Sequence, residues 1–155
     1  MNGIMSVFKK PSKPEFLYAG SSERSDILLP VREYNRGKKG MQRVVYATSV
    51  RDIALAYALG AVPDETGITD RVLSYKDTGE VKMIFHKGHP DFGGKGYVYR
   101  FLSKGFIHAG GTQWVNPNPI TPLEVTGINV DDYLHLFRYA TEEEKQHIEE
   151  DFAER

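Results

Sequence analysis

The sequence predicts an α+β protein in which many short strands are combined with one early helix and two late ones. Three observations carry this prediction. Short runs rich in β-branched and aromatic residues recur along the chain, a strand–turn–helix unit lies around residue 50, and helical spacing returns only after residue 130. Strands and helices do not alternate regularly, which argues against repeated βα units. We expect a single domain over 1–155, with an irregular lead-in over 1–14, a core over 15–128 and C-terminal helices over 129–155.

Composition and charge exclude several classes of protein. The chain has 155 residues, and 20 Lys and Arg against 21 Asp and Glu give it a formal net charge of −1. This balance argues against a general nucleic-acid binder, which would carry a basic excess. The absence of cysteine excludes disulfides, thiolate metal sites and a cysteine nucleophile. The longest apolar run, 53–62, is about half of what spans a bilayer, and the N-terminal segment lacks the apolar core of a signal peptide. We therefore expect a soluble, cytoplasmic protein that does not bind membranes.

The first half of the chain is expected to hold two strands. Residues 15–19 form a short β-type run that ends at Gly20. Residues 21–42 hold few apolar side chains and end in the basic glycine loop 36–40. Residues 44–47 form a second strand, rich in β-branched and aromatic side chains.

The early helix follows this second strand directly. Ser49 and Asp52 have the spacing of a capping box, with Asp in place of the usual Glu. Apolar residues then recur at helical spacing from Ile53, and Gly60 with Pro63 ends the helix.

The second half is predicted to consist of further strands followed by the late helices. The expected strands are 71–75, 81–86, 97–102, 113–116 and 123–130. A glycine-rich loop, 87–96, joins two of them. Helical spacing returns at 131–137, and Thr141 with Glu144 forms a full capping-box signature for a final helix over 142–153. We expect that helix to be marginal to the core, with Ile148 and Phe152 as its buried side chains.

Several kinds of site are considered and set aside. A metal site would use His86, His89 and Asp91, with His108 or His135 completing it, but surface histidines beside a turn explain the pattern better. No metal is expected. The loop 36–40 lacks the pattern of a nucleotide-triphosphate loop and reads better as a solvated loop than as a phosphate site. The loop 88–96 is no Rossmann fingerprint, and the chain has no nucleophile elbow of the G-x-S-x-G type.

Two tyrosines remain as candidates for a binding site. Tyr46 lies in the second strand, and Tyr57 lies in the helix that follows. If this helix folds back across the end of the strand, the two rings face each other across a gap that suits a planar guest. Stacking on such rings is worth about 0.5–1.5 kcal/mol beyond burial. Residue spacing alone leaves this interpretation level with plain packing of Tyr57 on the sheet.

The sequence around these tyrosines resembles the diphtheria-toxin and poly(ADP-ribose) polymerase type of ADP-ribosyltransferase. The segment Leu17–Ser21 (LYAGS) is similar to the family's first-strand pattern Tyr-His-Gly-Ser/Thr. Val45–Ser49 with Ala54–Tyr57 is similar to its second motif, in which a strand tyrosine and a helix tyrosine clamp nicotinamide. Gln113–Asn116 (QWVN) stands where small bacterial and phage relatives have Glu-Trp-Val-Ser, and Pro122–Val125 continues the likeness. The resemblance covers about residues 15–128.

The resemblance implies a fold, a ligand and a set of site residues. The fold would be a split core of two short, mainly antiparallel sheets. The ligand would be NAD, as a substrate, or a related nucleotide. The implied catalytic positions are Gln113 and Tyr46, and the implied binding positions are Tyr18, Ala19, Gly20, Ser21, Tyr46, Thr48 and Tyr57.

Two departures bear on activity. Ala19 occupies the family's histidine position, whose imidazole orients NAD, and Gln113 occupies the position of the catalytic glutamate. A glutamine keeps a neutral hydrogen bond but loses the charge and cannot act as a general base. Either another carboxylate (Glu124, Asp91 or Glu33) serves, or the transferase activity is lost, or the ligand differs.

Two functions therefore stay open. The first is an ADP-ribosyltransferase or NAD glycohydrolase that passes ADP-ribose to a protein, a nucleic acid or water. The second is a degenerate, non-catalytic module that binds a nucleotide or another protein.

Overall fold

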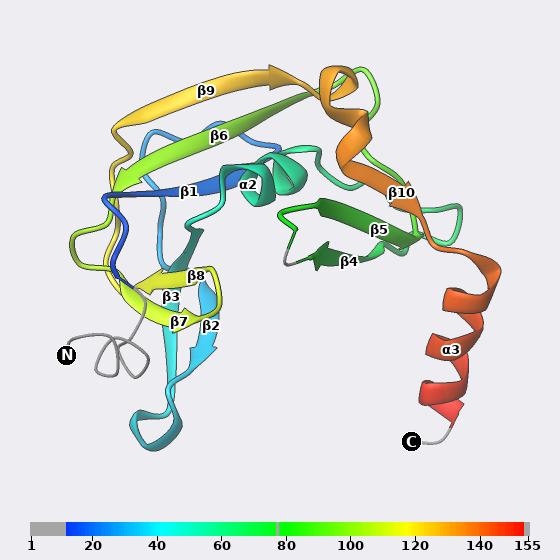
Figure 1. The fold of residues 1–155 in the computed structure, drawn as a ribbon, viewed down its shortest axis with the longest axis horizontal. Coiled ribbons are helices and arrows are strands. Elements are labelled where there is room, and N and C mark those ends of the chain that lie inside the picture. The colour runs from blue at the N-terminus through cyan, green and yellow to red at the C-terminus, as the bar shows by residue number, and fades with distance from the viewer. Residues whose placement is uncertain (1–11, 77, 154–155) are drawn as a thin grey trace.

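The chain forms an α+β structure with two mostly antiparallel sheets and few helices, as the sequence predicts (Figure 1). The structure is a computed structural model that describes residues 12–76 and 78–153. The larger sheet contains β1 (Phe16–Ser21), β2 (Arg32–Asn35), β3 (Met41–Thr48), β6 (Lys95–Leu102), β7 (Ile107–Gly110), β8 (Gln113–Asn116) and β9 (Glu124–Asn129). The smaller sheet contains β4 (Asp70–Tyr75), β5 (Val81–Lys87) and β10 (Phe137–Tyr139). The helical segments are η1 (Gly37–Lys39), α2 (Arg51–Ala58), η2 (Val130–Leu136) and α3 (Glu142–Ala153).

The larger sheet has the strand order β7-β8-β3-β1-β6-β9, and β2 also pairs with β3. Its first strand is longer than predicted. Gly20 and Ser21, which were expected to end it, continue the pairing with Val98 and Tyr97 of β6. In the smaller sheet β5 lies between β4 and β10, and its pairing with β10 is parallel.

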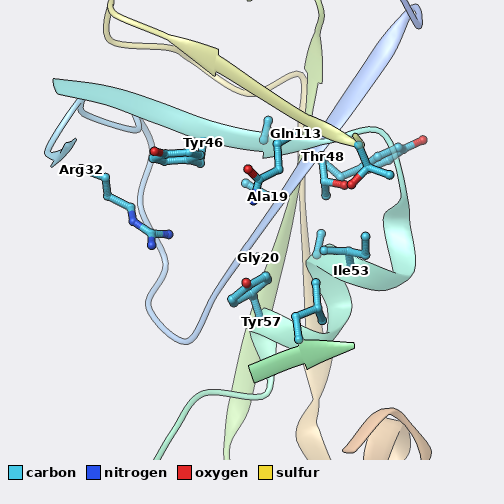
Figure 2. A pocket seen from close by; sticks show the side chains of 13 residues that line it. Ala19, Gly20, Arg32, Tyr46, Thr48, Ile53, Tyr57 and Gln113 are labelled. Carbon is cyan, nitrogen blue, oxygen red and sulfur yellow. The ribbon is translucent and has the colours of Figure 1, made fainter. Parts of the chain in front are cut away.

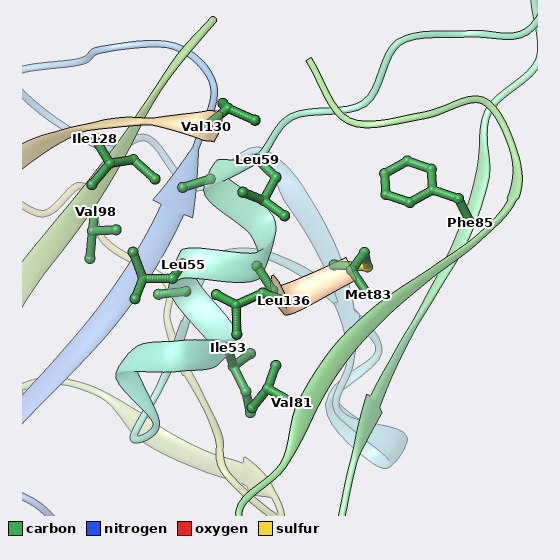
Figure 3. Packing of buried hydrophobic residues seen from close by; sticks show 13 residues of the cluster. Ile53, Leu55, Leu59, Val81, Met83, Phe85, Val98, Ile128, Val130 and Leu136 are labelled. Carbon is green, nitrogen blue, oxygen red and sulfur yellow. The ribbon is translucent and has the colours of Figure 1, made fainter. Parts of the chain in front are cut away.

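Helix α2 lies between the two sheets and supplies the centre of the main core (Figures 1 and 3). Its alanines Ala54, Ala56 and Ala58 are buried, so the helix backbone approaches its neighbours closely. The buried side chains of this core come from both sheets and from the helix: Ile53, Leu55, Leu59, Val81, Met83, Phe85, Val98, Ile128, Val130 and Leu136. The helix is thus fixed on both sides by apolar packing.

Two glycines let α2 rest directly on the larger sheet. A Cβ atom on Gly20 would lie 1.8 Å from the carbonyl oxygen of Ala54, and one on Gly96 would lie 1.9 Å from that of Ala58. No side chain fits in either place. Gly20 and Gly96 therefore set the distance of the helix from β1 and β6, and with it the position of every side chain that α2 carries.

A second core covers the other face of the larger sheet. It is formed by Leu17, Ala47, Tyr99, Phe101, Phe106 and Trp114. Alternation along β1 explains the division, because Leu17 and Ala19 point to this core while Tyr18 points to the core around α2.

The start of α2 differs from the prediction. The helix begins at Arg51, and its N-cap residue, Val50, makes no side-chain capping bond. The Ser49–Asp52 capping box is therefore wrong. Instead the Val50 N–H donates to Oγ1 of Thr48 over 3.1 Å, and the Ser49 N–H donates to the Thr112 carbonyl oxygen over 3.0 Å. The predicted end is confirmed, since Gly60 has a φ of +68°.

The C-terminal part contains one predicted helix and one helical segment of a different kind. The Thr141–Glu144 capping box of α3 is confirmed, because the Thr141 N–H donates to Oε1 of Glu144 over 2.9 Å and the Glu144 N–H donates to Oγ1 of Thr141 over 3.2 Å. The expected helix over 131–137 is a 3-10 segment, η2, that leads into β10. Figure 1 shows α3 leaving the body of the molecule beyond β10.

Some expectations fall on residues that the structure does not describe. They concern most of the lead-in, 1–11, and the side chains of Ile148 and Phe152. Among the described residues, no helix is long and apolar enough to cross a membrane.

Candidate functional site

A pocket opens where β1 and β3 separate. The two strands share one registered pair, Tyr18 opposite Thr48, within the described part of the chain. Beyond that pair, residues 19–20 continue along β6 and residues 46–47 continue along β8. Each segment therefore has one edge without a strand partner, and backbone N–H and C=O groups point into the opening from these edges.

Helix α2 forms one wall of this opening, and the resulting cavity has a volume of about 290 Å³. The residues that line it are Tyr18, Ala19, Gly20, Arg32, Tyr46, Ala47, Thr48, Ile53, Ala54, Tyr57, Leu73, Thr112 and Gln113. All of the predicted site residues except Ser21 are among them. Residues from three distant segments of the chain thus meet at one place (Figure 2).

The two tyrosine rings stand apart on different walls of the pocket (Figure 2). Tyr46 is held firmly, because its hydroxyl donates to the Glu33 carbonyl oxygen over 3.0 Å and its ring forms a T-shaped pair with that of Tyr34 at a centroid distance of 6.2 Å. Tyr57 is half-buried and packs against the core around α2. These two rings have no contact with each other, which leaves space between them.

Each of these rings is paired with an arginine. The Arg32 guanidinium carbon lies 5.0 Å from the centroid of Tyr46, and that of Arg71 lies 5.6 Å from the centroid of Tyr57. Both distances are within the range of cation–π attraction. Burial lowers the pKa of Arg71, the nearby charge of Arg32 lowers it further, and Tyr57 opposes this shift. A positive charge therefore lies beside each of the two rings.

The first-strand residues divide between the two faces of the sheet. Tyr18 and Gly20 lie on the face of α2, whereas Ala19 packs against the core around Tyr99 and reaches the pocket at the edge where the strands part. Ser21 does not line the pocket. Its Oγ accepts the Glu23 N–H over 3.1 Å, so it stabilises the turn after β1.

Gln113 lines the pocket, and its neighbours alternate as strand geometry requires. Its side chain is exposed and makes no hydrogen bond within the described residues. Trp114 is 6% exposed and lies in the opposite core, as predicted. Val115 pairs with Tyr46 and shares the face of Gln113, but it is fully buried and does not reach the cavity.

The alternative carboxylate Glu124 lies in the same cross-strand row as the pocket. The row runs from Gln113 through Thr48, Tyr18 and Arg100 to Glu124. Four strand spacings of roughly 4.8 Å separate its ends. Oε2 of Glu124 lies 3.4 Å from Nη2 of Arg100, and the residue does not line the cavity.

The other two candidate carboxylates also lie elsewhere. Asp91 is in the loop between β5 and β6, where its N–H donates over 3.1 Å to the carbonyl oxygen of Leu59, the C-cap residue of α2. Glu33 alternates with Arg32 along β2, so its side chain points away from the face that Arg32 shares with Tyr46. None of the lining residues is an Asp or a Glu.

The structure also bears on the two other sites considered from the sequence, a metal site and a phosphate loop. In the described part of the chain, no group of three His, Cys, Asp or Glu residues is arranged to hold a metal ion. The loop 36–40 is the turn between β2 and β3. The Gly37 N–H donates to Oδ1 of Asn35 and the Gly40 N–H to the Gly37 carbonyl oxygen, each over 2.9 Å. These amides are used within the turn, which favours a solvated turn over a phosphate loop.

Sequence reasoning missed the two arginines. Arg32 belongs to a strand of four residues in a stretch with few apolar side chains, and Arg71 begins an expected strand without any motif around it. Their common property, a stacked tyrosine partner at one pocket, arises only from the fold. The signal that could have drawn attention to Arg32 is its alternation with Tyr34, which is typical of a strand.

Comparison of this chain with family models, with curated proteins and with solved structures finds no match.

Proposed function

We propose that this pocket binds NAD or a related nucleotide, with the planar heterocycle between Tyr46 and Tyr57, on an ADP-ribosyltransferase-like fold. One observation carries the proposal. The three segments that resemble the family's motifs are far apart in the sequence, yet Tyr18–Gly20, Tyr46 with Tyr57, and Gln113 line the same cavity.

The volume and the aromatic walls of the pocket suit a heterocyclic ring with its sugar. Its volume of about 290 Å³ is at the lower end of the roughly 300–1,000 Å³ found for small-molecule sites. Two aromatic walls suit a flat heterocycle, whose stacking is worth about 0.5–1.5 kcal/mol beyond burial. The rest of a dinucleotide would extend through the open side.

The polar groups support the same ligand. The unpaired edges of β1 and β3 offer backbone N–H and C=O groups, which match the donor and acceptor of a carboxamide. The Thr48 hydroxyl accepts from the Val50 N–H and keeps its own proton to donate. The free amide of Gln113 has both a donor and an acceptor for a sugar hydroxyl.

The absence of a carboxylate from the pocket lining favours binding over transfer. An oxocarbenium-like transition state is stabilised by a negative charge held beside it, and losing a preorganised group of this kind costs about 10²–10³ in rate. Of the two functions, the nucleotide-binding module therefore has the stronger support. The transferase remains the second candidate.

Calorimetric titration with NAD, combined with measurement of free nicotinamide, tests both functions. We expect heat of binding without nicotinamide release. Tyr57→Leu keeps apolar packing but removes the ring, so it should weaken binding about two- to tenfold. Tyr139→Leu, at a tyrosine that is 52% exposed and outside this pocket, is the matched control. Release of nicotinamide by the wild type would favour the transferase, and the absence of any heat would refute both functions.

A further inference from the structure

Two arginines beside the pocket have no acidic partner. Arg32 lines the cavity and stacks on Tyr46, while Arg71 stacks on Tyr57 and donates from Nη1 to the Gly60 carbonyl oxygen over 3.1 Å. Within residues 12–76 and 78–153, neither guanidinium has a carboxylate oxygen within 4.0 Å. Among the other described arginines, Arg24, Arg100 and Arg138 each form an ion pair, whereas Arg36, Arg43 and Arg51 do not.

The acidic residues next to them in sequence do not neutralise them. Glu33 follows Arg32 but lies opposite Arg43 on the other face of β2. Asp70 precedes Arg71 but lies opposite Lys87, beyond a register shift in the pairing of β4 with β5. Two positive charges, one beside each of the pocket tyrosines, therefore have no ion-pair partner within the described residues.

These charges act on each other and keep their protons. Burial lowers the pKa of Arg71 and the charge of Arg32 lowers it further, with Tyr57 opposing the shift. A guanidinium nevertheless stays protonated in proteins, so a bound anion, rather than the loss of a proton, would relieve the repulsion between the two.

We propose that Arg32 and Arg71 form a subsite for the phosphate groups of the nucleotide, at the open side of the pocket. This inference rests on the proposed function and specifies its ligand as a phosphate-bearing nucleotide rather than a nucleoside or a free base. Two cations match the charge of a diphosphate. The Arg32 guanidinium makes no hydrogen bond within the described residues, so its N–H edge is free for paired hydrogen bonds to phosphate oxygens. Arg71 uses one N–H for the Gly60 carbonyl oxygen and adds its charge and its remaining donors.

The positions of the two residues agree with the size of the cavity. The walls formed by Tyr46 and Tyr57 enclose room for a heterocycle and its sugar, so the phosphates of the same ligand would have to lie outside them. Figure 2 shows Arg32 beside Tyr46, at the end of the pocket away from Thr48 and Ile53. The phosphates would therefore leave the pocket along β2 and the start of β4.

Inorganic pyrophosphate and NAD are the probes for the test. Binding of pyrophosphate and of NAD to the full chain and to each variant is measured by calorimetry, and in the wild type the Arg32 Nε–H signal is also followed by two-dimensional NMR while pyrophosphate is added. Arg32→Gln removes one charge from an exposed side chain, and Arg43→Gln makes the same change on the other face of the same hairpin. Arg71→Lys keeps the charge and removes the fork geometry.

We expect Arg32→Gln to lower the affinity for pyrophosphate and for NAD about tenfold or more, because it removes charge-assisted hydrogen bonds. Arg43→Gln should stay within about twofold, since exposed charges at a distance are screened by salt. Arg71→Lys should give an intermediate loss.

The outcomes separate the two proposals. NAD binding that is equal in Arg32→Gln and the wild type overturns the phosphate subsite and leaves the nucleotide pocket standing. Arg32-dependent binding of pyrophosphate without any binding of NAD supports the subsite and refutes the proposed function. Binding of neither probe refutes both.

Discussion

Tyr18 and Thr48 lie opposite each other where β1 and β3 make their one registered pair within the described residues, and the pocket begins beside this pair. If the antiparallel register continued, the strands would close and no cavity would exist. Instead each strand turns to its outer partner, β6 or β8. The separation of β1 from β3 thus creates the cavity and leaves the backbone edges beside it unpaired. It also lets Tyr57 of α2 line the cavity.

Gly20 is predicted to be essential for stability as well as for the pocket. A methyl group at this position would overlap the Ala54 carbonyl oxygen, at 1.8 Å, so Gly20→Ala should push α2 away from β1. Overpacking of this kind costs about 1–3 kcal/mol, measurable by denaturant unfolding. Gly127→Ala is the matched control, because a Cβ there would lie 3.7 Å from its nearest neighbour, the Tyr97 ring. Equal free energies of unfolding for the two variants would refute the close packing.

The start of α3 is predicted to be sensitive to acid. Hydrogen bonds from Arg138 lower the pKa of Glu144 from 4.5 to about 2, and bonds from Thr141 act in the same direction. Because the pKa is lower in the folded state, this stabilisation is present above pH 4.5 and is lost as the pH falls towards about 2. Titration of the Glu144 carboxyl carbon by NMR should give a midpoint near 2.

Two variants provide the control for that titration. Glu144→Gln should remove the acid dependence of the amide shifts at the start of α3, whereas Glu142→Gln alters the charge of the same helical turn without a contact to Arg138. A normal carboxyl midpoint for Glu144 would show that the pair with Arg138 does not persist in solution.

Removal of residues 141–155 is predicted to leave a folded protein. Helix α3 leaves the body of the molecule in Figure 1, and its first turn is attached through the exposed pair Arg138–Glu144, with Nη1 2.7 Å from Oε1. Exposed ion pairs contribute about 0–1 kcal/mol. A scanning-calorimetry experiment should therefore show a fall in Tm of about 2–4 °C. Loss of all soluble protein would mean that the segment is part of the core.

Restoring the family residues is predicted to create or raise NAD glycohydrolase activity. Gln113→Glu places a carboxylate at the pocket, where it would interact with positive charge that develops mainly in the transition state. Combined with Ala19→His, it should raise nicotinamide release by about one to two decades, which corresponds to about 1.4–2.8 kcal/mol. Gln146→Glu, on exposed α3, makes the same charge change away from the pocket.

A double variant that folds and binds NAD, yet releases no nicotinamide, would show that Gln113 does not stand at the catalytic position. A wild type that is already fully active would place the carboxylate elsewhere. Glu124 would then be the first residue to test, since it lies in the same cross-strand row as Gln113.

The sequence predicts the longer strands and α3 well because their patterns are local. Alternation marks β5 and β6, and the capping box marks the start of α3. The strands that it misses, β2, β7 and β10, have three or four residues each. β2 and β7 pair with the neighbouring strands β3 and β8, whereas β10 exists only through its pairing with the distant β5. The start of α2 was misplaced for the same reason, because the Ser49 N–H bonds to Thr112, a residue far along the chain.

In the candidate site, too, the features that are local in sequence could be predicted and those that depend on distant segments could not. Tyr46 and Tyr57 belong to a strand–turn–helix unit that is local in sequence, so their neighbourhood could be anticipated. Arg32 and Arg71 could not, because their positions depend on how β2 and β4 are placed relative to that unit. The sequence predicts Ser21 beside the pocket. In the structure its side chain lies on the face of β1 opposite to Tyr18, and it bonds to the turn after the strand.

The most direct test of the nucleotide pocket is the detection of intermolecular nuclear Overhauser effects between bound NAD and tyrosine ring protons. We predict contacts from the nicotinamide protons to the rings of both Tyr46 and Tyr57, with the adenine protons outside this pair. Contacts instead to His89 or Tyr139, which line a separate surface cavity, or the absence of any contact at saturating NAD, would contradict the account.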